Sequence, residues 1–451
     1  MSQEGSNSSL WARAATAAAK TPASRNRYVD FLRAVSILAV VCGHWVMAAP
    51  YMEAGQIRAG HMLDLAPWTR WLTWGFQVMP VFFIVGGFSN GITWEAAKRD
   101  ARPYGDWLSD RLRRLVGPLL PVLVAWAVIA AVANWRGVNP EVISVGSRMA
   151  LIPTWFLAVY VGVVLLAPVT YGAWRRFGFA SFWALVAAAV VVDVVFFRFE
   201  SWRWLGWSNY AFVWLAVHQL GYAWRDGRLG GLRRALPWCV GGLAALVLLI
   251  KFGPYPHSMV GVPGEAVSNT QPPKITLLAL GAFQGGLLLM LEAPGRRWLE
   301  RGRAWTATVL INGMIMTVYL WHLTASTLVF GLAALLGGIG LQLTPGTSAW
   351  WSWRPAWVGA YIVALALLSL VFARFERPAP RAPGESAPAG WRLVVGALVL
   401  SYGLSTLVLG GVSGDGWFGL RVVALLLPFA GAVLMGMGMP KFLKERAFRT
   451  R

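Results

Sequence analysis

Charged residues are scarce in this chain of 451 residues. They make up 13% of it, whereas a soluble domain carries about a quarter. Apolar residues reach 57%, tryptophan occurs 27 times, and the mean hydropathy is +0.55. These values exclude an ordinary soluble globular fold and predict an all-α polytopic membrane protein.

Acidic residues are the scarcer charge, with 19 Asp and Glu against 40 Lys and Arg, so the formal net charge is +21. A charge of this size suggests nucleic acid only where the basic residues gather on a water-exposed face. Here they are distributed between apolar segments. We therefore expect no nucleic-acid partner, and we expect the basic residues to face the headgroups of the lipid bilayer.

Cysteine is nearly absent. Cys42 and Cys239 both lie inside apolar segments, so we expect small buried hydrophobic residues and no disulfide. The five histidines and two cysteines are too dispersed for a metal-ligand spacing, so no metal site is expected. The first residues also lack an apolar stretch followed by a small-residue cleavage site. We expect a retained first span, preceded by a disordered cytoplasmic tail over residues 1–27.

Taking roughly 20 apolar residues as the length that crosses a bilayer, the chain contains about twelve spans. They cover residues 29–49, 71–92, 115–134, 150–171, 179–197, 209–224, 235–252, 275–291, 306–328, 355–374, 392–411 and 417–437. Residues 329–343 are apolar, short and Gly-rich, so they either lengthen the ninth span or form a separate re-entrant piece.

Alternate connections differ sharply in their content of Lys and Arg. About 29 of the 40 basic residues fall on one side together with both chain ends, and about 8 on the other, which by the positive-inside rule places both termini in the cytoplasm. The Pro/Ala/Gly-rich linker 376–390 separates a ten-helix core, residues 28–375, from a two-helix hairpin at 391–437 and a basic cytoplasmic tail at 438–451. No internal repeat is visible, which disfavours transporter architectures.

Polar residues interrupt the first span. In "VDFLRAVSILAVVCGHW", Arg33 and His44 are eleven residues apart, almost three helical turns, so both side chains lie on nearly one face and about 16 Å apart in depth. Asp30 lies three residues before Arg33 and can pair with it. An Arg near a helix end can also reach lipid headgroups, whereas a His within a span usually faces a protein interior or a watered cavity.

A second histidine, His322, lies about 16 residues into the predicted ninth span, and His44 lies about 15 residues into the first. The two imidazoles are therefore expected to share one depth, as two walls of one cavity would require. Single polar residues elsewhere, Asn312, Gln77, Gln284 and His218, are more simply interpreted as hydrogen-bonded links between helices. Asp193 and Lys251 lie near outer span ends, where exposure to water is the simpler interpretation.

Before the third span, "SDRLRRLVGP" holds Arg111, Arg113 and Arg114. Such a cluster can bind an anion bidentately, although juxtamembrane arginines more commonly anchor a helix. An elongated ligand with a phosphorylated head in the cytoplasm and a reactive tail deep in the protein would use this cluster together with Arg33 and His44.

Five segments in this order resemble the acyltransferase 3 family of integral membrane acyltransferases. They are "VDFLRAVSILAVVCGHW" with its Asp-x-Leu-Arg start and Arg-x10-His spacing, "MPVFFIVGGFSNG", "RLRRLVGPLLP", "PTWFLAVYV" and "VYLWHL". Together they cover roughly residues 25–375. Gly86 departs from the family, which commonly has Ser at that position, and the C-terminal hairpin lies outside the shared region.

The resemblance implies a membrane-bound O-acyltransferase, most simply an O-acetyltransferase. Such enzymes move an acyl group from cytoplasmic acetyl-CoA or another acyl-CoA to a hydroxyl of an extracytoplasmic glycan, lipid or exported small molecule of the cell envelope, which implies the plasma (inner) membrane. By the resemblance His44 is the catalytic histidine, Arg33, Arg111 and Arg114 hold the acyl-CoA, and His322 is a recurrent histidine of the site.

A neutral imidazole suits removal of the acceptor's hydroxyl proton near pH 7, so His44 is expected to act as general base, and an acyl-His intermediate is the chemical alternative. Asp30 supports Arg33. Trp155 either lines the acceptor entrance or belongs to an interfacial aromatic belt. The rival function is a membrane transporter or flippase for a polar or lipid-linked substrate, in which intramembrane Arg and His form a substrate or proton path. A non-catalytic membrane partner is a third reading.

Overall fold

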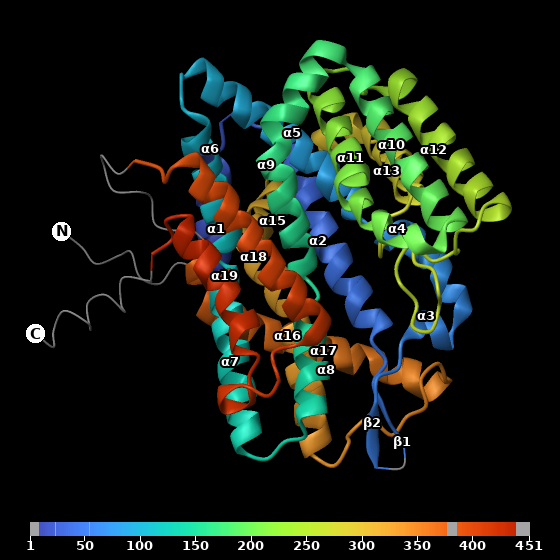
Figure 1. The fold of residues 1–451 in the computed structure, drawn as a ribbon, viewed down its shortest axis with the longest axis vertical. Coiled ribbons are helices and arrows are strands. Elements are labelled where there is room, and N and C mark those ends of the chain that lie inside the picture. The colour runs from blue at the N-terminus through green and yellow to red at the C-terminus, as the bar shows by residue number, and fades with distance from the viewer. Residues whose placement is uncertain (1–8, 23, 54, 377–385, 439–451) are drawn as a thin grey trace, which may run out of the picture. The chain divides into compact units, whose positions relative to one another are not determined.

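The computed structural model describes residues 9–22, 24–53, 55–376 and 386–438. Over these residues the chain is helical apart from one short ribbon (Figure 1). It divides into two units. Unit 1 comprises residues 1–93, 167–315 and 332–358, and unit 2 comprises residues 94–166, 316–331 and 359–451.

The α-helices are α1 (Leu10–Ala19), α2 (Arg27–Met47), α3 (Met62–Leu65), α4 (Thr73–Phe76), α5 (Met79–Arg99), α6 (Tyr104–Val116), α7 (Leu119–Trp135), α8 (Pro140–Leu151), α9 (Thr154–Phe177), α10 (Phe179–Arg198), α11 (Asn209–Arg225), α12 (Leu232–Phe252), α13 (Ile275–Met290), α14 (Glu292–Leu299), α15 (Gly302–Asn312), α16 (Ile315–Leu335), α17 (Ser348–Phe372), α18 (Gly390–Gly410) and α19 (Val422–Leu434). Four 3-10 segments accompany them: η1 (Pro67–Leu72), η2 (Glu200–Ser208), η3 (Ala373–Phe375) and η4 (Trp417–Gly419).

Nine helical stretches in the described ranges are long and apolar enough to cross a membrane, or ten if the bent pair α13 and α14 is one span. This agrees with a multi-pass membrane protein. The twelve-span count stays a prediction, because α11 has 17 residues and α19 has 13, both shorter than the other spans. Helix α11 is buried along most of its length, so protein surrounds much of it.

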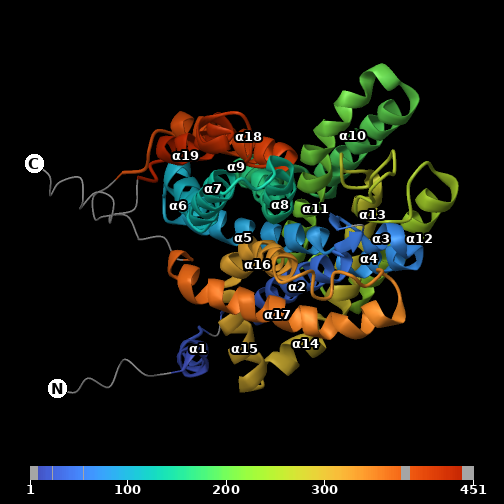
Figure 2. The same cartoon turned by 90° about the horizontal axis from the view of Figure 1, so that it is seen from below.

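The expected disordered tail over residues 1–27 is wrong over residues 9–22, which contain helix α1. This helix packs against α15 (Figure 2). The indole nitrogen of Trp305 donates to the Ala18 carbonyl at 3.3 Å and to Thr21 Oγ1 at 3.2 Å. An alanine-rich sequence favours the helix, and the contact with α15 fixes it. Residues 1–8 lie outside the described residues.

The expected ninth span, residues 306–328, is also divided. Helix α15 ends at Asn312, and Met314 has a non-helical conformation with φ −134° and ψ 22° before α16 begins at Ile315. The open question on residues 329–343 is answered in part, because α16 continues to Leu335 and turns with positive φ follow at Gly337, Gly338 and Gly340. The expectation that His322 lies about 16 residues into its helix is therefore wrong. It lies seven residues after Ile315.

The all-α fold class is confirmed, and one short antiparallel ribbon accompanies the helices. It consists of strands β1 (Tyr51–Glu53) and β2 (Gln56–Arg58), with Tyr51 opposite Arg58. Gly55 in the connecting turn has φ 77°, a conformation that glycine adopts without strain. The ribbon leads the chain from the end of α2 back toward α3.

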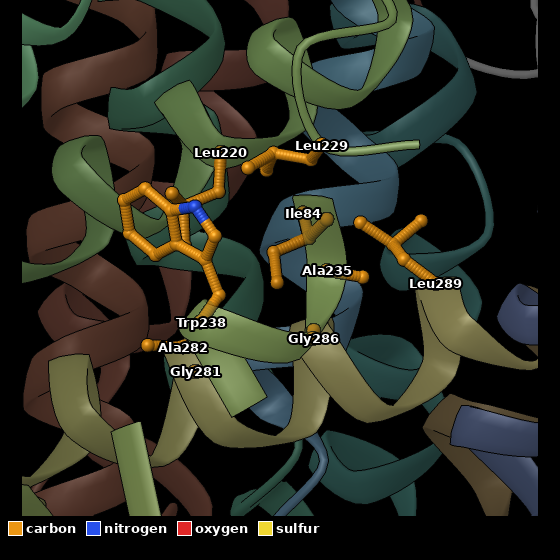
Figure 3. Close-up of a pocket in the computed structure, with 10 residues that line it drawn as sticks. Ile84, Leu220, Leu229, Ala235, Trp238, Gly281, Ala282, Gly286 and Leu289 are labelled. Atoms are coloured by element: carbon orange, nitrogen blue, oxygen red, sulfur yellow. The ribbon is translucent and has the colours of Figure 1, made fainter. Parts of the chain in front are cut away.

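Unit 1 packs α12 closely against α13. A Cβ on Gly286 would lie 2.4 Å from the Cys239 backbone nitrogen, and one on Gly242 would lie 2.3 Å from that of Phe283. Small residues let two helix backbones approach in this way within a membrane protein. An apolar pocket lies beside this contact (Figure 3), lined among others by Ile84, Leu220, Leu229, Trp238 and Leu289. Its lining carries no titratable side chain, so it offers no acyl-transfer chemistry.

Unit 2 contains α18 and α19, which pack side by side (Figure 1). Helix α18 contacts α6 and α8, and α19 contacts α7. Polar contacts support this packing, since Ser144 Oγ donates to the Gly410 carbonyl at 3.2 Å and Arg113 Nη2 to the Gly436 carbonyl at 3.1 Å. The predicted linker 376–390 and tail 438–451 fall mostly outside the described residues.

Candidate active site

The amino-terminal end of α2 carries a network of charged side chains within unit 1. Asp30 is 6% exposed. Its carboxylate accepts from Arg25 Nε at 2.6 Å and from Arg33 Nη1 at 3.4 Å. The predicted pairing of Asp30 with Arg33 is confirmed. The hydrogen bond to Asp30 also raises the pKa of Arg25, which lies before the helix.

Arg33 has a second partner that sequence reasoning missed. Its Nη2 donates to Ser89 Oγ of α5 at 3.2 Å. Ser89 lies three residues after Gly86, the position where the resemblance led us to expect a hydroxyl. Two of the five guanidinium N–H groups are thus engaged, and 30% of the Arg33 side chain stays exposed.

The side of α2 that links Arg33 to His44 is continuous, because the helix runs unbroken from Arg27 to Met47. The expected placement of both side chains on nearly one helix face is therefore confirmed. His44 lies in the last turn and is partly exposed.

Several segments of unit 1 gather around this last turn of α2. Ala48 pairs with His61 in an antiparallel bridge, and the Ala49 nitrogen donates to the Gly60 carbonyl at 3.0 Å. A Cβ on Gly43 would lie 3.6 Å from the Phe76 ring, so α4 covers the helix directly beside His44.

His61 was not identified from the sequence, and its ring is held by its own backbone. The Leu63 nitrogen donates to His61 Nδ1 at 3.3 Å, which assigns the ring proton to Nε2. Burial lowers the pKa of His61, an effect that the Asp64 carboxylate opposes. A lowered pKa leaves His61 neutral near pH 7.

Arg354 of α17 is a further residue that sequence reasoning missed. Its Nη2 donates to the carbonyl oxygens of Trp45 at 2.6 Å, Ala48 at 2.7 Å and Val46 at 3.1 Å. The run "SAWWSWRPAW" gave no signal for this contact, because it joins residues some 300 positions apart.

The arginines of α6 belong to unit 2. Arg111 lies 5.9 Å from the ring centroid of Trp107, Arg113 donates to the Gly436 carbonyl, and Arg114 is exposed. Helix α6 is amphipathic, and its buried residues include Trp107, Leu108 and Leu112. Arg113 holds the C-terminal segment. Arg111 and Arg114 stay the residues that the resemblance predicts for binding an anion.

His322 lies in α16, also in unit 2, and is completely buried at 0% exposure. Its Nδ1 lies 2.6 Å from the Tyr319 carbonyl, so Nδ1 donates. The Tyr319 ring lies 5.7 Å from Phe156 and the Phe156 ring 6.2 Å from Trp155. Two intervening rings thus join the predicted residues Trp155 and His322 into one aromatic series.

The amino terminus of α16 has a carboxylate that the sequence led us to place in a flexible linker. Glu376 accepts from the backbone nitrogens of Met316 and Thr317 at 2.8 Å each, and from Thr317 Oγ1 at 2.6 Å. These are N–H groups that a helix start leaves without intrahelical partners. Glu376 therefore caps the helix that carries His322.

The structure thus distributes the predicted residues between the units. Unit 1 holds Asp30, Arg33 and His44 on one helix, and unit 2 holds Arg111, Arg114, Trp155 and His322. The equal-depth argument for His44 and His322 loses its basis, because the helix of His322 begins at Ile315 and not near residue 306.

The expected water exposure of Asp193 is wrong, since this residue is 1% exposed. Its carboxylate accepts from Asn209 Nδ2 at 2.9 Å, from Tyr255 Oη at 3.2 Å and from the Ile275 nitrogen at 2.9 Å. Lys274 Nζ lies 3.9 Å away and 3.5 Å from the Phe196 ring centroid. Burial lowers the pKa of Lys274 to about 8, and the Asp193 charge opposes this shift.

Single polar residues elsewhere link segments, as expected. Asn312 Nδ2 donates to the Asp30 carbonyl at 2.9 Å, Gln77 Nε2 to the Met259 carbonyl at 3.3 Å, and Gln284 Nε2 to the Trp74 carbonyl at 2.9 Å. His218 Nε2 lies 3.1 Å from Asn90 Nδ2. Over the described part of the chain no group of three or more His, Cys, Asp or Glu could hold a metal ion.

Comparison with known proteins adds one finding. A family model described as an acyltransferase domain matches residues 26–374, which is most of the chain. No curated protein and no solved structure matches. The matched region contains every candidate residue from Asp30 to His322 and ends just before Glu376.

Proposed function

Because the chain belongs to the acyltransferase 3 family, we propose that it is a multi-pass enzyme of the plasma membrane that transfers an acyl group, most simply acetyl, from cytoplasmic acyl-CoA. The acceptor is a hydroxyl of an extracytoplasmic glycan, lipid or exported small molecule. The observation that carries this proposal is the unbroken helix α2, in which a partly exposed Arg33 and a partly exposed His44 occupy one face.

Acyl-CoA binding is assigned to the arginines. Arg33 keeps N–H groups beyond those given to Asp30 and Ser89, and an arginine fork suits the oxygens of a phosphate. Arg114 is exposed on α6, and Arg111 presents its guanidinium beside Trp107. In this proposal Arg33 binds a phosphate and the pantetheine arm follows α2 toward His44, while Arg111 and Arg114 are the phosphate-binding candidates within unit 2.

His44 acts as the general base. It takes the proton from the acceptor hydroxyl while the hydroxyl oxygen attacks the thioester carbonyl, the C–S bond breaks, and the proton passes to the leaving sulfur to give CoA–SH and the ester. No other reactant is needed. Asp30 holds Arg33. Within unit 2, Trp155 is the candidate acceptor-side residue, and the rings of Phe156 and Tyr319 connect it to His322.

The test is release of CoA from acetyl-CoA by the purified protein in nanodiscs, with and without a crude cell-envelope extract as acceptor. We expect turnover that rises with the extract and is lost in His44→Ala. The matched control is His257→Ala, because His257 is an exposed loop residue whose ring meets Trp71 edge to face. Turnover that survives in His44→Ala would remove His44 from the reaction. No turnover and no acyl-CoA binding by folded protein would favour a transporter or flippase instead.

A further inference from the structure

A buried arginine, Arg354, binds the carboxyl end of α2, next to the turn that carries His44. Arg354 is 7% exposed, and its guanidinium lies 4.2 Å from the Trp350 ring centroid. From there it donates to the three carbonyl oxygens of Trp45, Val46 and Ala48. A single side chain thus takes up most of the carbonyl groups that a helix leaves unpaired at its carboxyl end.

These carbonyl groups matter for a histidine in the same turn. They form the negative end of the helix dipole, which stabilises a protonated histidine near the carboxyl terminus by about 0.3 to 2 kcal/mol. A protonated imidazole has no lone pair with which to take a proton. The position of His44 on α2 would therefore work against its use as a base.

We propose that Arg354 is a positioning residue that keeps His44 in its neutral, proton-accepting form by occupying the carboxyl-terminal carbonyl groups of α2. This inference rests on the proposed function of His44. The guanidinium stays charged at every working pH, so a fixed positive charge stands where the helix would otherwise favour a proton on the imidazole. The hydrogen bonds also hold the backbone of the turn that aims the ring.

On the described segments that follow α2, the other charged groups do not supply such a charge. These are Glu53 and Arg58, paired at 3.4 Å, Arg70 and Glu265, paired at 3.0 Å, and His61 with the exposed Asp64. Helix α4 carries no charged residue. Because burial lowers the pKa of His61, this residue is neutral near pH 7.

The remaining charged groups around α2 belong to its other end. They are Arg27, Asp30 and Arg33 on α2 itself, Glu292, Arg296 and Arg297 on α14, and Arg303 on α15. Helices α14 and α15 contact the beginning of α2, where Tyr28 Oη donates to the Leu288 carbonyl at 2.7 Å and Asn312 to the Asp30 carbonyl. At about 1.5 Å per residue, Arg33 is some 16 Å from His44 along the helix.

The experiment compares the pH dependence of CoA release in the wild type, Arg354→Gln and Arg354→Lys in nanodiscs. In Arg354→Gln the pH of half-maximal kcat on the acidic side is expected to rise by about 0.2 to 1.5 units, which is the helix-dipole effect converted to pH. The KM for acyl-CoA is expected to stay unchanged. Arg354→Lys retains the charge and is expected to restore most of the wild-type profile.

The matched control is Arg421→Gln. Arg421 Nη1 donates to the carbonyls of Thr406 at 2.9 Å and Gly411 at 3.3 Å, at the carboxyl end of α18. It performs the same backbone contact on a helix without a histidine. We expect lower thermal stability but an unchanged pH profile. An unshifted profile in folded Arg354→Gln, or equal shifts in the Gln and Lys variants, would overturn the proposal.

A second readout does not depend on catalysis. The chain has five histidines, so ¹⁵N-histidine NMR can follow each ring, and the signal lost in His44→Ala identifies His44. The midpoint of the His44 titration is expected to be higher in Arg354→Gln than in the wild type. If the wild type shows no acyl transfer but this shift is seen, the proposed function fails, while the effect of Arg354 on the protonation of His44 stands. If the midpoint is unshifted, that effect is contradicted, whatever turnover is measured.

Discussion

Each of the two helices that carry a candidate histidine has a charged side chain bound to the backbone of one terminus, and the two charges have opposite signs. The carboxyl end of α2 meets the guanidinium of Arg354, and the amino end of α16 meets the carboxylate of Glu376. Each charge has the sign that its helix dipole favours. In a membrane each also satisfies backbone groups that lipid leaves unpaired at a cost of several kcal/mol.

The histidines themselves differ in accessibility. His44 is partly exposed in the last turn of α2, whereas His322 is 0% exposed and donates from Nδ1 to the Tyr319 carbonyl. A reacting base must be reached by the acceptor hydroxyl. Under the proposed function, His44 is therefore the expected base and His322 the expected supporting residue, although both are histidines within apolar helices.

The largest expected effect follows from His44. Replacing it with alanine should lower kcat for acyl transfer by about 10²- to 10⁴-fold, the range of a lost general base. The thermal unfolding midpoint should change little, because the side chain is partly exposed. A time course of CoA release gives kcat, and thermal unfolding in nanodiscs gives the unfolding midpoint. A small effect on kcat would contradict the role of His44 as the base.

His322→Ala should show the reverse pattern. Removal of the buried ring leaves polar groups of α16 without their partner, and we expect the free energy of unfolding to fall by about 1 to 3 kcal/mol. Turnover of the protein that remains folded should fall far less than in His44→Ala. If folded His322→Ala loses as much activity as His44→Ala, both histidines take part in the chemistry.

A smaller effect is expected at the other end of α2. Arg33→Lys keeps the charge but loses the planar fork, so the KM for acyl-CoA should rise about tenfold with little change in kcat. Arg25→Lys is the matched control, because Arg25 also pairs with Asp30 but is 54% exposed and lies before the helix. Equal effects in the two variants would mean that Arg33 serves only the Asp30 network.

What the sequence could predict about the site was local. The spacing of Arg33 and His44 and the pairing of Asp30 with Arg33 follow from helix geometry alone, and α2 has that geometry. The apolar segments likewise predicted most of the helices. The break after α15 had a signal that was not used, since Asn312 and Gly313 form an Asn-Gly pair inside the apolar run.

What could not be predicted depends on contacts between distant residues. Ser89, Arg354 and His61 reach α2 from segments that no periodicity relates to it. Asp193 looked exposed because it lies near the end of a span, but Tyr255 and Lys274 from a later segment cover it. The composition around Glu376 is typical of a linker, and its role becomes visible only once α16 is folded beside it.

The smallest expected effect concerns that cap. Glu376→Ala removes a carboxylate that accepts from two backbone N–H groups of α16, and loss of such a cap costs about 0.5 to 2 kcal/mol of stability. Glu376→Gln keeps one acceptor oxygen and loses the other oxygen and the charge, so it should retain part of this stability. The control is Glu141→Ala, because Glu141 also lies in the first turn of a helix of unit 2 but is exposed. We expect the thermal unfolding midpoint to decrease in the order Glu141→Ala, Glu376→Gln, Glu376→Ala, while the pH profile of CoA release stays that of the wild type. A shifted pH profile in the Glu376 variants would show that the charge at the start of α16 acts on the reacting base. The distinction between α2, which carries the base, and α16, which carries only a supporting histidine, would then fail.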